Sequence, residues 1–238
     1  MKLDILAFGA HPDDVELGAG ATIAKEISLG KKVGVVDLTR GELGTRGSAE
    51  IRDNEAANSA KILRLSSRDN LAFADGFFIN DKAHQTEVIK MIRKYRPEVV
   101  LCNAVDDRHI DHPKGSKLVS NSCFLSGLVK FETELDGQLQ EAWRPKRVYH
   151  YIQWKNLEPD FVVDVTGFID KKLEAILAYS SQFYDPKSDE PETPISNKNF
   201  IDSVTYRARD LGRYINADYA EGFITERYPA VNSLEDLI

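Results

Sequence analysis

The sequence predicts an α/β protein with a Rossmann-like, doubly wound and mostly parallel sheet, helices on both faces and a C-terminal elaboration. Strand-like apolar runs alternate with helix-like periodic stretches up to about residue 130, which favours parallel strands joined by helices. Two of these runs, at residues 5–8 and 99–103, are followed directly by clusters of histidine and aspartate. Ligands of open α/β sheets bind outside the carboxyl ends of the strands, so we expect the functional site there.

Chain length and composition suit a single globular domain. The 238 residues are 42% hydrophobic and 29% charged, which is ordinary for a soluble protein, and a chain of this length can enclose a sizeable core. The sequence contains no internal repeat. We therefore predict one domain over residues 1–238, with the sheet core in about residues 1–165 and C-terminal helices and loops in about residues 166–238.

Charge and hydropathy exclude several classes of partner. The formal net charge is −7, and no stripe of lysine and arginine suits a nucleic-acid backbone. No apolar run approaches the roughly 18–20 residues of a membrane span, and the N-terminus lacks the features of a signal peptide. We therefore expect a cytoplasmic protein that binds neither nucleic acid nor membrane.

Cysteine usage limits the kinds of metal site that the chain can form. Cys102 and Cys123 are the two cysteines, and they lack a Cys-x-x-Cys spacing. We predict buried reduced thiols rather than a disulfide or a thiolate metal site. Any metal must then be bound by nitrogen and oxygen ligands.

The first half of the chain supplies most of the predicted sheet. The strand at residues 5–8 ends at Gly9, and the helix at residues 15–29 has apolar residues at helical spacing with Gly30 after it. The run Gly18-Ala19-Gly20 lacks the full G-x-G-x-x-G pattern, so it indicates close helix packing more than a dinucleotide site. Further strands are predicted at residues 33–38, 71–73 and 99–103, and further helices at residues 48–63, 81–95 and 113–130.

The second half of the chain is less regular. Aromatic and β-branched runs predict strands, and helical spacing predicts helices. The predicted strands are at residues 147–154 and 161–165, and the predicted helices at residues 171–184 and 200–214. Prolines, serines and aspartates predict a loop or flap at residues 185–199. His84 is expected on the surface and His150 inside a strand, so neither is a candidate metal ligand.

The first polar cluster contains one imidazole and two adjacent carboxylates. His11 and one of Asp13 and Asp14 are ordinary ligands for a divalent ion such as zinc, which takes about four donors and leaves one position to water in catalytic sites. If Pro12 stiffens the turn, the two carboxylates cannot both reach one ion, and the other is left to act on the water. The alternative is that both aspartates merely cap the following helix.

A second cluster supplies groups that the first one lacks. His109, Asp111 and His112 follow the strand at residues 99–103, so three of the five histidines lie in two loops that follow strands. This cluster can provide a third metal ligand and a group for proton transfer. We therefore predict that the two loops lie at neighbouring strand ends and form one site.

The two motifs together resemble a known family. Ala10-His11-Pro12-Asp13-Asp14-Val15-Glu16 and, about a hundred residues later, His109-Ile110-Asp111-His112 are similar to motifs of the LmbE-like (PIG-L) zinc-dependent N-deacetylases. The resemblance extends over nearly the whole chain and is strongest to the bacillithiol-pathway deacetylases, which act on N-acetylglucosaminyl malate. Ile110 stands where relatives often have proline, a change that affects loop stiffness more than chemistry.

The resemblance implies a role for each residue of the site. The expected zinc ligands are His11, Asp14 and His112. Asp13 is expected to be the base that takes a proton from the zinc-activated water. His109 is expected to be the cationic donor that stabilises the tetrahedral oxyanion, and Asp111 to orient His109 and favour its protonated form.

Two arginines are implied as substrate-binding residues. The resemblance places Arg52 and Arg108 where the bacillithiol-type enzymes meet the malate carboxylates. A guanidinium group can pair with a carboxylate through two parallel hydrogen bonds, which is the physical reason to expect arginine there. The alternative for each arginine is an ion pair within the protein. Arg46 is left without a role.

Other functions stay open at this point. The alternative substrate is another N-acetylated glycan, and the alternative class is a non-catalytic sugar- or nucleotide-binding module whose loops hold a structural metal. A two-metal phosphoesterase is disfavoured because such sites need more ligands. Iron or another divalent ion is the alternative to zinc. The resemblance also implies a small-molecule glycoside as substrate and a homo-oligomer.

Overall fold

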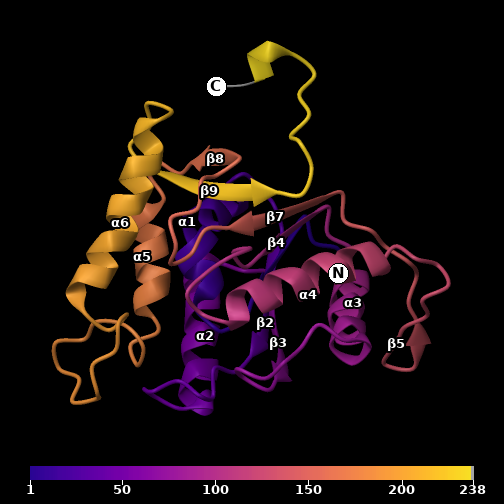
Figure 1. The fold of residues 1–238 in the computed structure, drawn as a ribbon, viewed down its shortest axis with the longest axis horizontal. Coiled ribbons are helices and arrows are strands. Elements are labelled where there is room, and N and C mark those ends of the chain that lie inside the picture. The colour runs from indigo at the N-terminus through magenta and orange to yellow at the C-terminus, as the bar shows by residue number, and fades with distance from the viewer. Residues whose placement is uncertain (237–238) are drawn as a thin grey trace.

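A seven-stranded sheet forms the centre of the computed structural model, which describes residues 1–236 (Figure 1). Its strands are β1 (Ile5–Gly9), β2 (Val33–Thr39), β3 (Ser67–Phe73), β4 (Val99–Cys102), β7 (Arg147–Tyr151), β8 (Phe161–Asp164) and β9 (Ala220–Thr225). They are ordered β3-β2-β1-β4-β7-β9-β8 across the sheet. Each strand predicted from the sequence therefore belongs to this sheet.

β1 lies in the middle of the parallel part of the sheet. It pairs in parallel with β2 on one side and with β4 on the other, and β3 and β7 extend the parallel part outward. After β1, the chain first places β2 and β3 on one side of it and then places β4 and β7 on the other side. Such a switch point leaves a crevice at the carboxyl ends of the two strands.

The C-terminal part of the chain also contributes to the sheet. β9 lies between β7 and β8 and is antiparallel to both. The expectation that the sheet core ends near residue 165 is therefore wrong. Local periodicity does not report that a strand from far along the chain will be inserted between two earlier ones.

Helices cover both faces of the sheet, as predicted. They are α1 (Asp14–Ser28), α2 (Ala49–Leu63), α3 (Lys82–Tyr95), α4 (Asp111–Leu125), α5 (Ile169–Leu177) and α6 (Lys198–Arg213). Alternate residues of β1 face two different cores: Phe8 belongs to the core with α3 and α4, and Ala7 to the core with α1 and α5. α6 packs outside α2 and α5 through a third cluster that includes Tyr179 and Phe200.

Small residues let α1 lie close to the sheet. A Cβ atom at Gly18 would lie only 2.1 Å from Cδ2 of Tyr151 in β7. The Tyr151 hydroxyl in turn donates to the carbonyl oxygen of Phe8 at 2.8 Å. The glycine therefore serves helix packing, as predicted, because a larger side chain would collide with the aromatic ring.

Two local features differ from the prediction. A short hairpin, β5 (Glu134–Leu135) and β6 (Gln138–Leu139), turns at Asp136 and Gly137, whose φ angles are 52° and 76°. Positive φ at both residues suits a two-residue hairpin turn, and an Asp-Gly pair is a recognised signal for it. The helix predicted to reach residue 184 ends at Leu177, since the backbone N–H of Ser181 donates to Glu55 Oε1 at 2.7 Å instead of continuing the helix.

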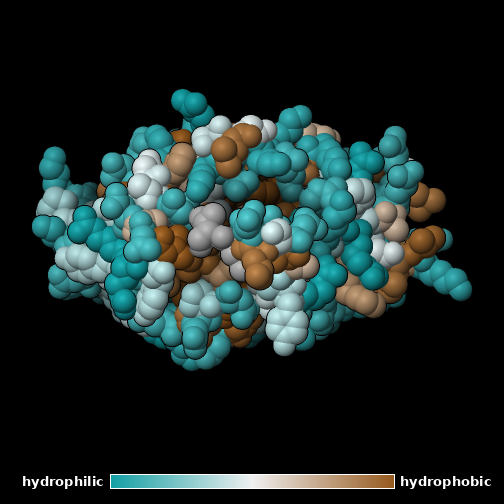
Figure 2. All heavy atoms as spheres, turned by 90° about the horizontal axis from the view of Figure 1, so that it is seen from above, coloured by the Kyte–Doolittle hydropathy of each residue, from teal (hydrophilic) through white to brown (hydrophobic). Residues whose placement is uncertain are grey.

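The surface is largely polar. The face shown in Figure 2 is mostly hydrophilic, with hydrophobic residues in separate patches. Exposed apolar side chains include Phe77, Val129 and Tyr228. A short 3₁₀ helix, η1 (Leu234–Asp236), follows Tyr228 near the end of the described chain. Among residues 1–236, no helix combines the length and the apolar character needed to cross a bilayer.

Candidate metal centre

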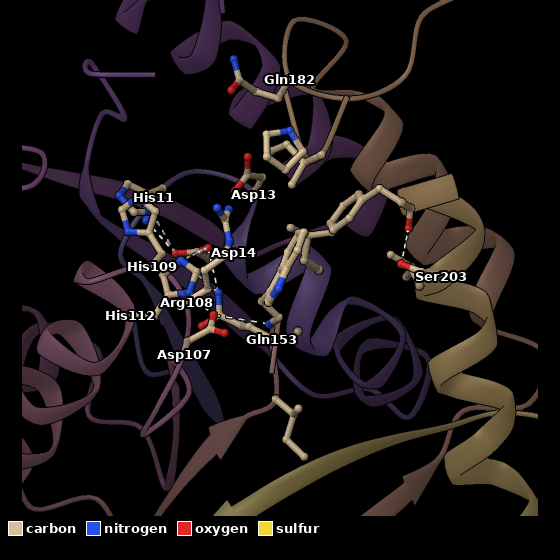
Figure 3. A pocket seen from close by; sticks show the side chains of 18 of the residues that line it. His11, Asp13, Asp14, Asp107, Arg108, His109, His112, Gln153, Gln182 and Ser203 are labelled. Atoms are coloured by element: carbon tan, nitrogen blue, oxygen red, sulfur yellow. Dashed lines mark hydrogen bonds and ion pairs between the residues drawn. The ribbon is translucent and has the colours of Figure 1, made fainter. Parts of the chain in front are cut away.

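A cavity of about 420 Å³ lies at the carboxyl ends of the parallel strands (Figure 3). Loops that follow β1 and β4 line one side, and α6 lines the other together with Trp154, which follows β7. The predicted site residues in its lining are His11, Asp13, Asp14, Arg52, Arg108, His109 and His112. The two sequence motifs are thus brought together at the switch point between β1 and β4, as predicted.

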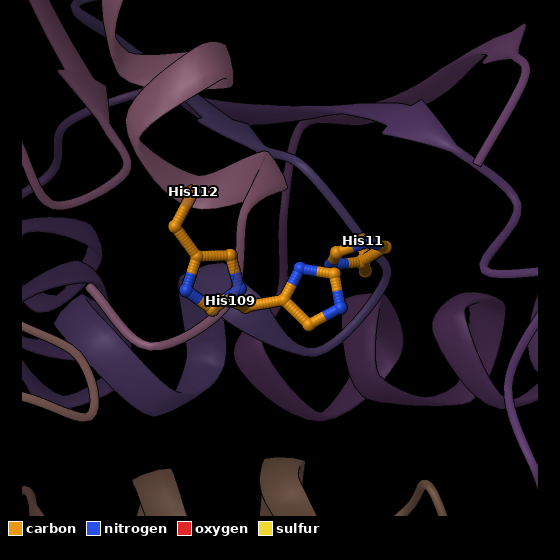
Figure 4. A group of neighbouring side chains, drawn as sticks. All are labelled: His11, His109 and His112. Atoms are coloured by element: carbon orange, nitrogen blue, oxygen red, sulfur yellow. The ribbon is translucent and has the colours of Figure 1, made fainter. Parts of the chain in front are cut away.

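Three histidines form the polar end of this cavity (Figure 4). The ring centroids are 4.6 Å apart for His11 and His109, 5.1 Å for His109 and His112, and 5.7 Å for His11 and His112. One nitrogen from each ring can lie within 4.8 Å of the others. A second such group consists of His11 with the carboxylates of Asp75 and Asp111. Both groups are compatible with a bound cation.

Asp14 contacts both histidines that the family motif implies as ligands. Its Oδ2 lies 3.5 Å from His11 Nδ1, and its Oδ1 lies 3.1 Å from His112 Nε2. Two amides fix this carboxylate, since Asn103 Nδ2 donates to Oδ2 at 3.0 Å and Gln153 Nε2 donates to Oδ1 at 2.9 Å. Burial opposes ionisation, but His112 and His11 hold the pKa of Asp14 well below its usual range.

The charge balance of the cluster favours a cation. Burial lowers the pKa of His112, but Asp14 and Asp107 outweigh burial and raise it to about 9. The pKa of His11 is also well above its usual value despite burial, because Asp111, Asp14 and Asp75 surround it. Buried carboxylates at this density need positive charge nearby, which protons or a metal ion can provide.

Asp13 does not cap α1, so the capping alternative is wrong for this residue. It stands at the N-cap position without a side-chain cap bond, and its φ is 108°. A non-glycine residue in this region is strained, and such strain is common at functional sites. Its Oδ2 instead accepts from Arg52 Nη2 at 2.9 Å. Burial raises the pKa of Asp13 to about 7, with Arg52 opposing this shift and Asp14 adding to it.

The predicted relation between Asp111 and His109 needs correction. The Asp111 carboxylate accepts from the backbone N–H of Gly76 at 2.7 Å and from Lys114 Nζ at 3.0 Å, and it lies 3.4 Å from His11 Nε2. Asp111 contacts His109 through its backbone instead, since the N–H of Asp111 donates to His109 Nδ1 at 3.3 Å. Burial lowers the pKa of His109, and the charges of His11 and His112 add to this. With Nδ1 accepting this hydrogen bond, a neutral His109 carries its hydrogen on Nε2.

The two predicted substrate arginines lie in different surroundings. Arg52 is buried, and besides Asp13 its guanidinium contacts the carbonyl oxygens of Pro12 and Gly41. Arg108 is exposed, and its guanidinium carbon lies 4.4 Å from the ring centroid of Trp154. Its role as a carboxylate ligand stays a prediction, while Arg52 already binds the predicted base.

Sequence reasoning missed four polar residues of the site. They are Asp75, Asn103, Asp107 and Gln153. Each of them follows the carboxyl end of β3, β4 or β7 by at most five residues. The rule that located His11 after β1 applies equally to these strands, so the available signal was a polar residue after each parallel strand.

An aromatic stack forms part of the opposite wall of the cavity. Trp154 and Phe200 lie 5.7 Å apart and nearly parallel, and Phe200 stacks on Phe183 at 6.0 Å. The predicted loop contributes Thr193 and Ile195 to the lining. This side of the cavity is therefore mainly apolar, in contrast to the histidine side.

The remaining histidines lie outside the cavity lining. His150 is buried in β7, as predicted, with Nδ1 2.8 Å from Ser116 Oγ and Nε2 3.2 Å from Glu226 Oε1. His84 is only half-buried, but its ring packs edge-on against Phe73 at 4.7 Å rather than lying free on the surface. Neither residue belongs to the candidate metal centre.

Fold and site together define a Rossmann-like protein with a candidate hydrolase metal centre at its switch point. The model of the family described as PIG-L, GlcNAc-PI de-N-acetylase, matches residues 6–123, a stretch that contains every predicted site residue. The solved structure of the conserved protein TT1542 from Thermus thermophilus is 34% identical, covers 98% of both chains and has a TM-score of 0.87. The chain belongs to the PIG-L (LmbE-like) family.

Two further relatives have named activities. The diacetylchitobiose deacetylase of Thermococcus kodakarensis is 28% identical over 190 residues, which are 75% of this chain and 70% of that protein. The solved N,N'-diacetylchitobiose deacetylase from Pyrococcus horikoshii is 27% identical and has a TM-score of 0.79, covering 98% of this chain and 88% of that one. The family resemblance inferred from the two motifs is thus confirmed.

Proposed function

We propose that this chain is a zinc-dependent N-deacetylase that hydrolyses the acetamide of an N-acetylglucosamine conjugate. The observation that carries this proposal is the buried carboxylate of Asp13, which lines the same cavity as His11, Asp14 and His112. This carboxylate pairs with Arg52 rather than with either histidine. A closed structural metal site needs no such spare base, whereas hydrolysis does. The named activities of the two chitobiose deacetylases support the same reaction.

The residues present fit a single zinc ion. The imidazoles of His11 and His112 both lie within contact distance of the Asp14 carboxylate, and this donor set is typical of catalytic zinc sites. His11, Asp14 and His112 would hold the ion. When bound, zinc supplies an activated water and a polarised carbonyl group.

The protein's own residues then divide the remaining work. Asp13, held by Arg52 at 2.9 Å, takes the proton as water attacks the acetamide carbon. His109 donates from Nε2 to the developing oxyanion, since its Nδ1 is occupied by the Asp111 N–H. The proton that the departing amine needs comes from Asp13, which carries the one taken from the water.

The substrate part of the proposal is N-acetylglucosaminyl malate, as in bacillithiol biosynthesis. The exposed Arg108 at the cavity supports an anionic aglycone, because a guanidinium group pairs well with carboxylates. The aromatic wall around Trp154 offers flat faces for a sugar ring. A cytoplasmic location and a homo-oligomeric state are further parts of this proposal.

The test is amine release from purified, zinc-loaded protein. We expect turnover of N-acetylglucosaminyl malate well above that of N-acetylglucosamine, loss of activity with a chelator, and recovery when zinc is returned. Equal rates on both compounds would overturn the malate part alone. No amine from either compound, or from diacetylchitobiose, would contradict the deacetylase proposal.

A further inference from the structure

Each of the two histidines proposed to bind zinc has a carboxylate on the ring nitrogen that points away from Asp14. For His11, Nδ1 lies 3.5 Å from Asp14 Oδ2, while Nε2 lies 3.0 Å from Asp75 Oδ1. For His112 the two nitrogens are exchanged: Nε2 lies 3.1 Å from Asp14 Oδ1, and Nδ1 lies 2.5 Å from Asp107 Oδ2. The two rings are thus held on their far sides by different carboxylates, and Figure 3 shows Asp107 beside His112.

Both carboxylates are fixed by the backbone. Asp75 Oδ2 accepts from the N–H of Leu43 at 3.0 Å, and Asp107 Oδ1 accepts from the N–H of Lys155 at 2.9 Å. Both residues are buried, with 6% and 7% of their surface exposed. Fixed and buried acceptors can set the orientation of an imidazole ring, whereas mobile surface carboxylates cannot.

Asp111 is a weaker candidate for the same role at His11. Its Oδ2 lies 3.4 Å from His11 Nε2, beyond the 3.0 Å of Asp75, and it already accepts from the N–H of Gly76 at 2.7 Å. Asp75 Oδ1 is therefore the nearer acceptor for the hydrogen on His11 Nε2.

We propose that Asp75 and Asp107 are positioning residues that select which nitrogen of each histidine binds the metal. A neutral imidazole carries its hydrogen on one nitrogen and a lone pair on the other. A carboxylate that accepts this hydrogen fixes the tautomer and leaves the opposite nitrogen for the metal. The metal-binding atoms are then His11 Nδ1 and His112 Nε2, the two that face Asp14. The inference rests on the metal site of the proposed function but not on its substrate.

Zinc affinity provides the first test. We expect Asp75→Asn and Asp107→Asn each to weaken zinc binding roughly 10–100-fold, measured by competition with a chromophoric chelator. The matched control is Asp106→Asn, because this exposed aspartate is adjacent in sequence to Asp107 and pairs with Lys155 Nζ rather than with a histidine. The zinc affinity of the Asp106→Asn variant should equal that of the unmodified protein. Circular dichroism of the metal-free variants checks that they are folded.

Histidine tautomers provide the second test and require no variant. In ¹⁵N-labelled, zinc-loaded protein, long-range ¹H–¹⁵N spectra should place the hydrogen on Nε2 of His11 and on Nδ1 of His112. A hydrogen on His11 Nδ1 or His112 Nε2 would overturn the proposal even if the variants misfold. Unchanged zinc affinity in both folded variants would also overturn it. Failure of deacetylation with the expected tautomers and affinities would instead count only against the proposed function.

Discussion

The two sides of the cavity are built in different ways. The histidine side comes from two short motifs, one after β1 and one after β4, and its groups carry charge and hydrogen bonds. The opposite side comes from Trp154 after β7, α6 and the loop before α6, and its contacts are mainly aromatic stacking. The difference suggests that the first side performs the chemistry, while the second shapes the space for the substrate and depends on close packing.

The largest expected effect on the histidine side is that of His112→Ala. This change removes the nitrogen that faces Asp14 at 3.1 Å, so zinc binding and deacetylation should both fall to background. Zinc content after dialysis and amine release provide the measurement. His84→Ala serves as a control, since His84 lies outside the cavity lining. Retained zinc in the His112 variant would contradict the proposed ligand set.

The next largest effect is expected for Asp13→Asn. An asparagine cannot accept the proton, so kcat should fall by roughly 10²–10⁴-fold while zinc content stays unchanged. Asp53→Asn is a suitable control because this carboxylate is exposed and pairs with Arg40 outside the cavity. If the Asp13 variant keeps its full rate, another group must act as the base.

Arg108→Ala tests whether this exposed arginine of the cavity lining binds a carboxylate of the substrate. The loss of one charged contact, about 1.5–3 kcal/mol, should raise KM for the malate conjugate roughly 10–100-fold and leave KM for N-acetylglucosamine nearly unchanged. Arg144→Ala is a matched control, because Arg144 also stacks on an aromatic ring, 4.3 Å from the centroid of Phe124. Equal changes for both substrates would show that Arg108 does not distinguish them.

Gly18→Ala tests the packing behind the site and should have the smallest effect on chemistry. The new Cβ would lie 2.1 Å from Tyr151, and overpacking of this kind costs about 1–3 kcal/mol. We expect a fall in Tm of several degrees with zinc affinity retained. Gly20→Ala is the control, since its Cβ would come no closer than 3.2 Å to its nearest neighbour, Cγ of Lys172. Equal Tm values for the two variants would contradict this account.

Much of the candidate site could be predicted because it follows one rule. Buried apolar runs end at the switch point, and the next polar residues enter the crevice there. His11, the pair Asp13 and Asp14, His109 and His112 follow from this rule, and the structure brings them together. The choice of Asp14 over Asp13 as the metal ligand came from the family resemblance. Asp75 and Gln153 obey the same rule but were missed, since neither lies in a motif with other histidines or acids.

The partners of Asp111 and Arg52 could not be predicted from sequence spacing. Asp111 is two residues from His109, yet its carboxylate binds Gly76 and Lys114, because it lies at the start of α4 and turns toward the loop after β3. Arg52 reaches Asp13 from α2 across 39 residues of sequence. Such pairings depend on how helices lie on the sheet.

The sequence by itself determined the α/β class, the parallel arrangement of the early strands and the two loops that carry the chemistry, since buried strands, helix periods and strand-end clusters are local patterns. Only the tertiary structure decided that β9 is inserted between β7 and β8, that Asp13 pairs with Arg52, and that Asp75 and Asp107 lie behind the two histidines. These features join residues far apart in the chain, and contacts of that kind are fixed by packing rather than by local sequence.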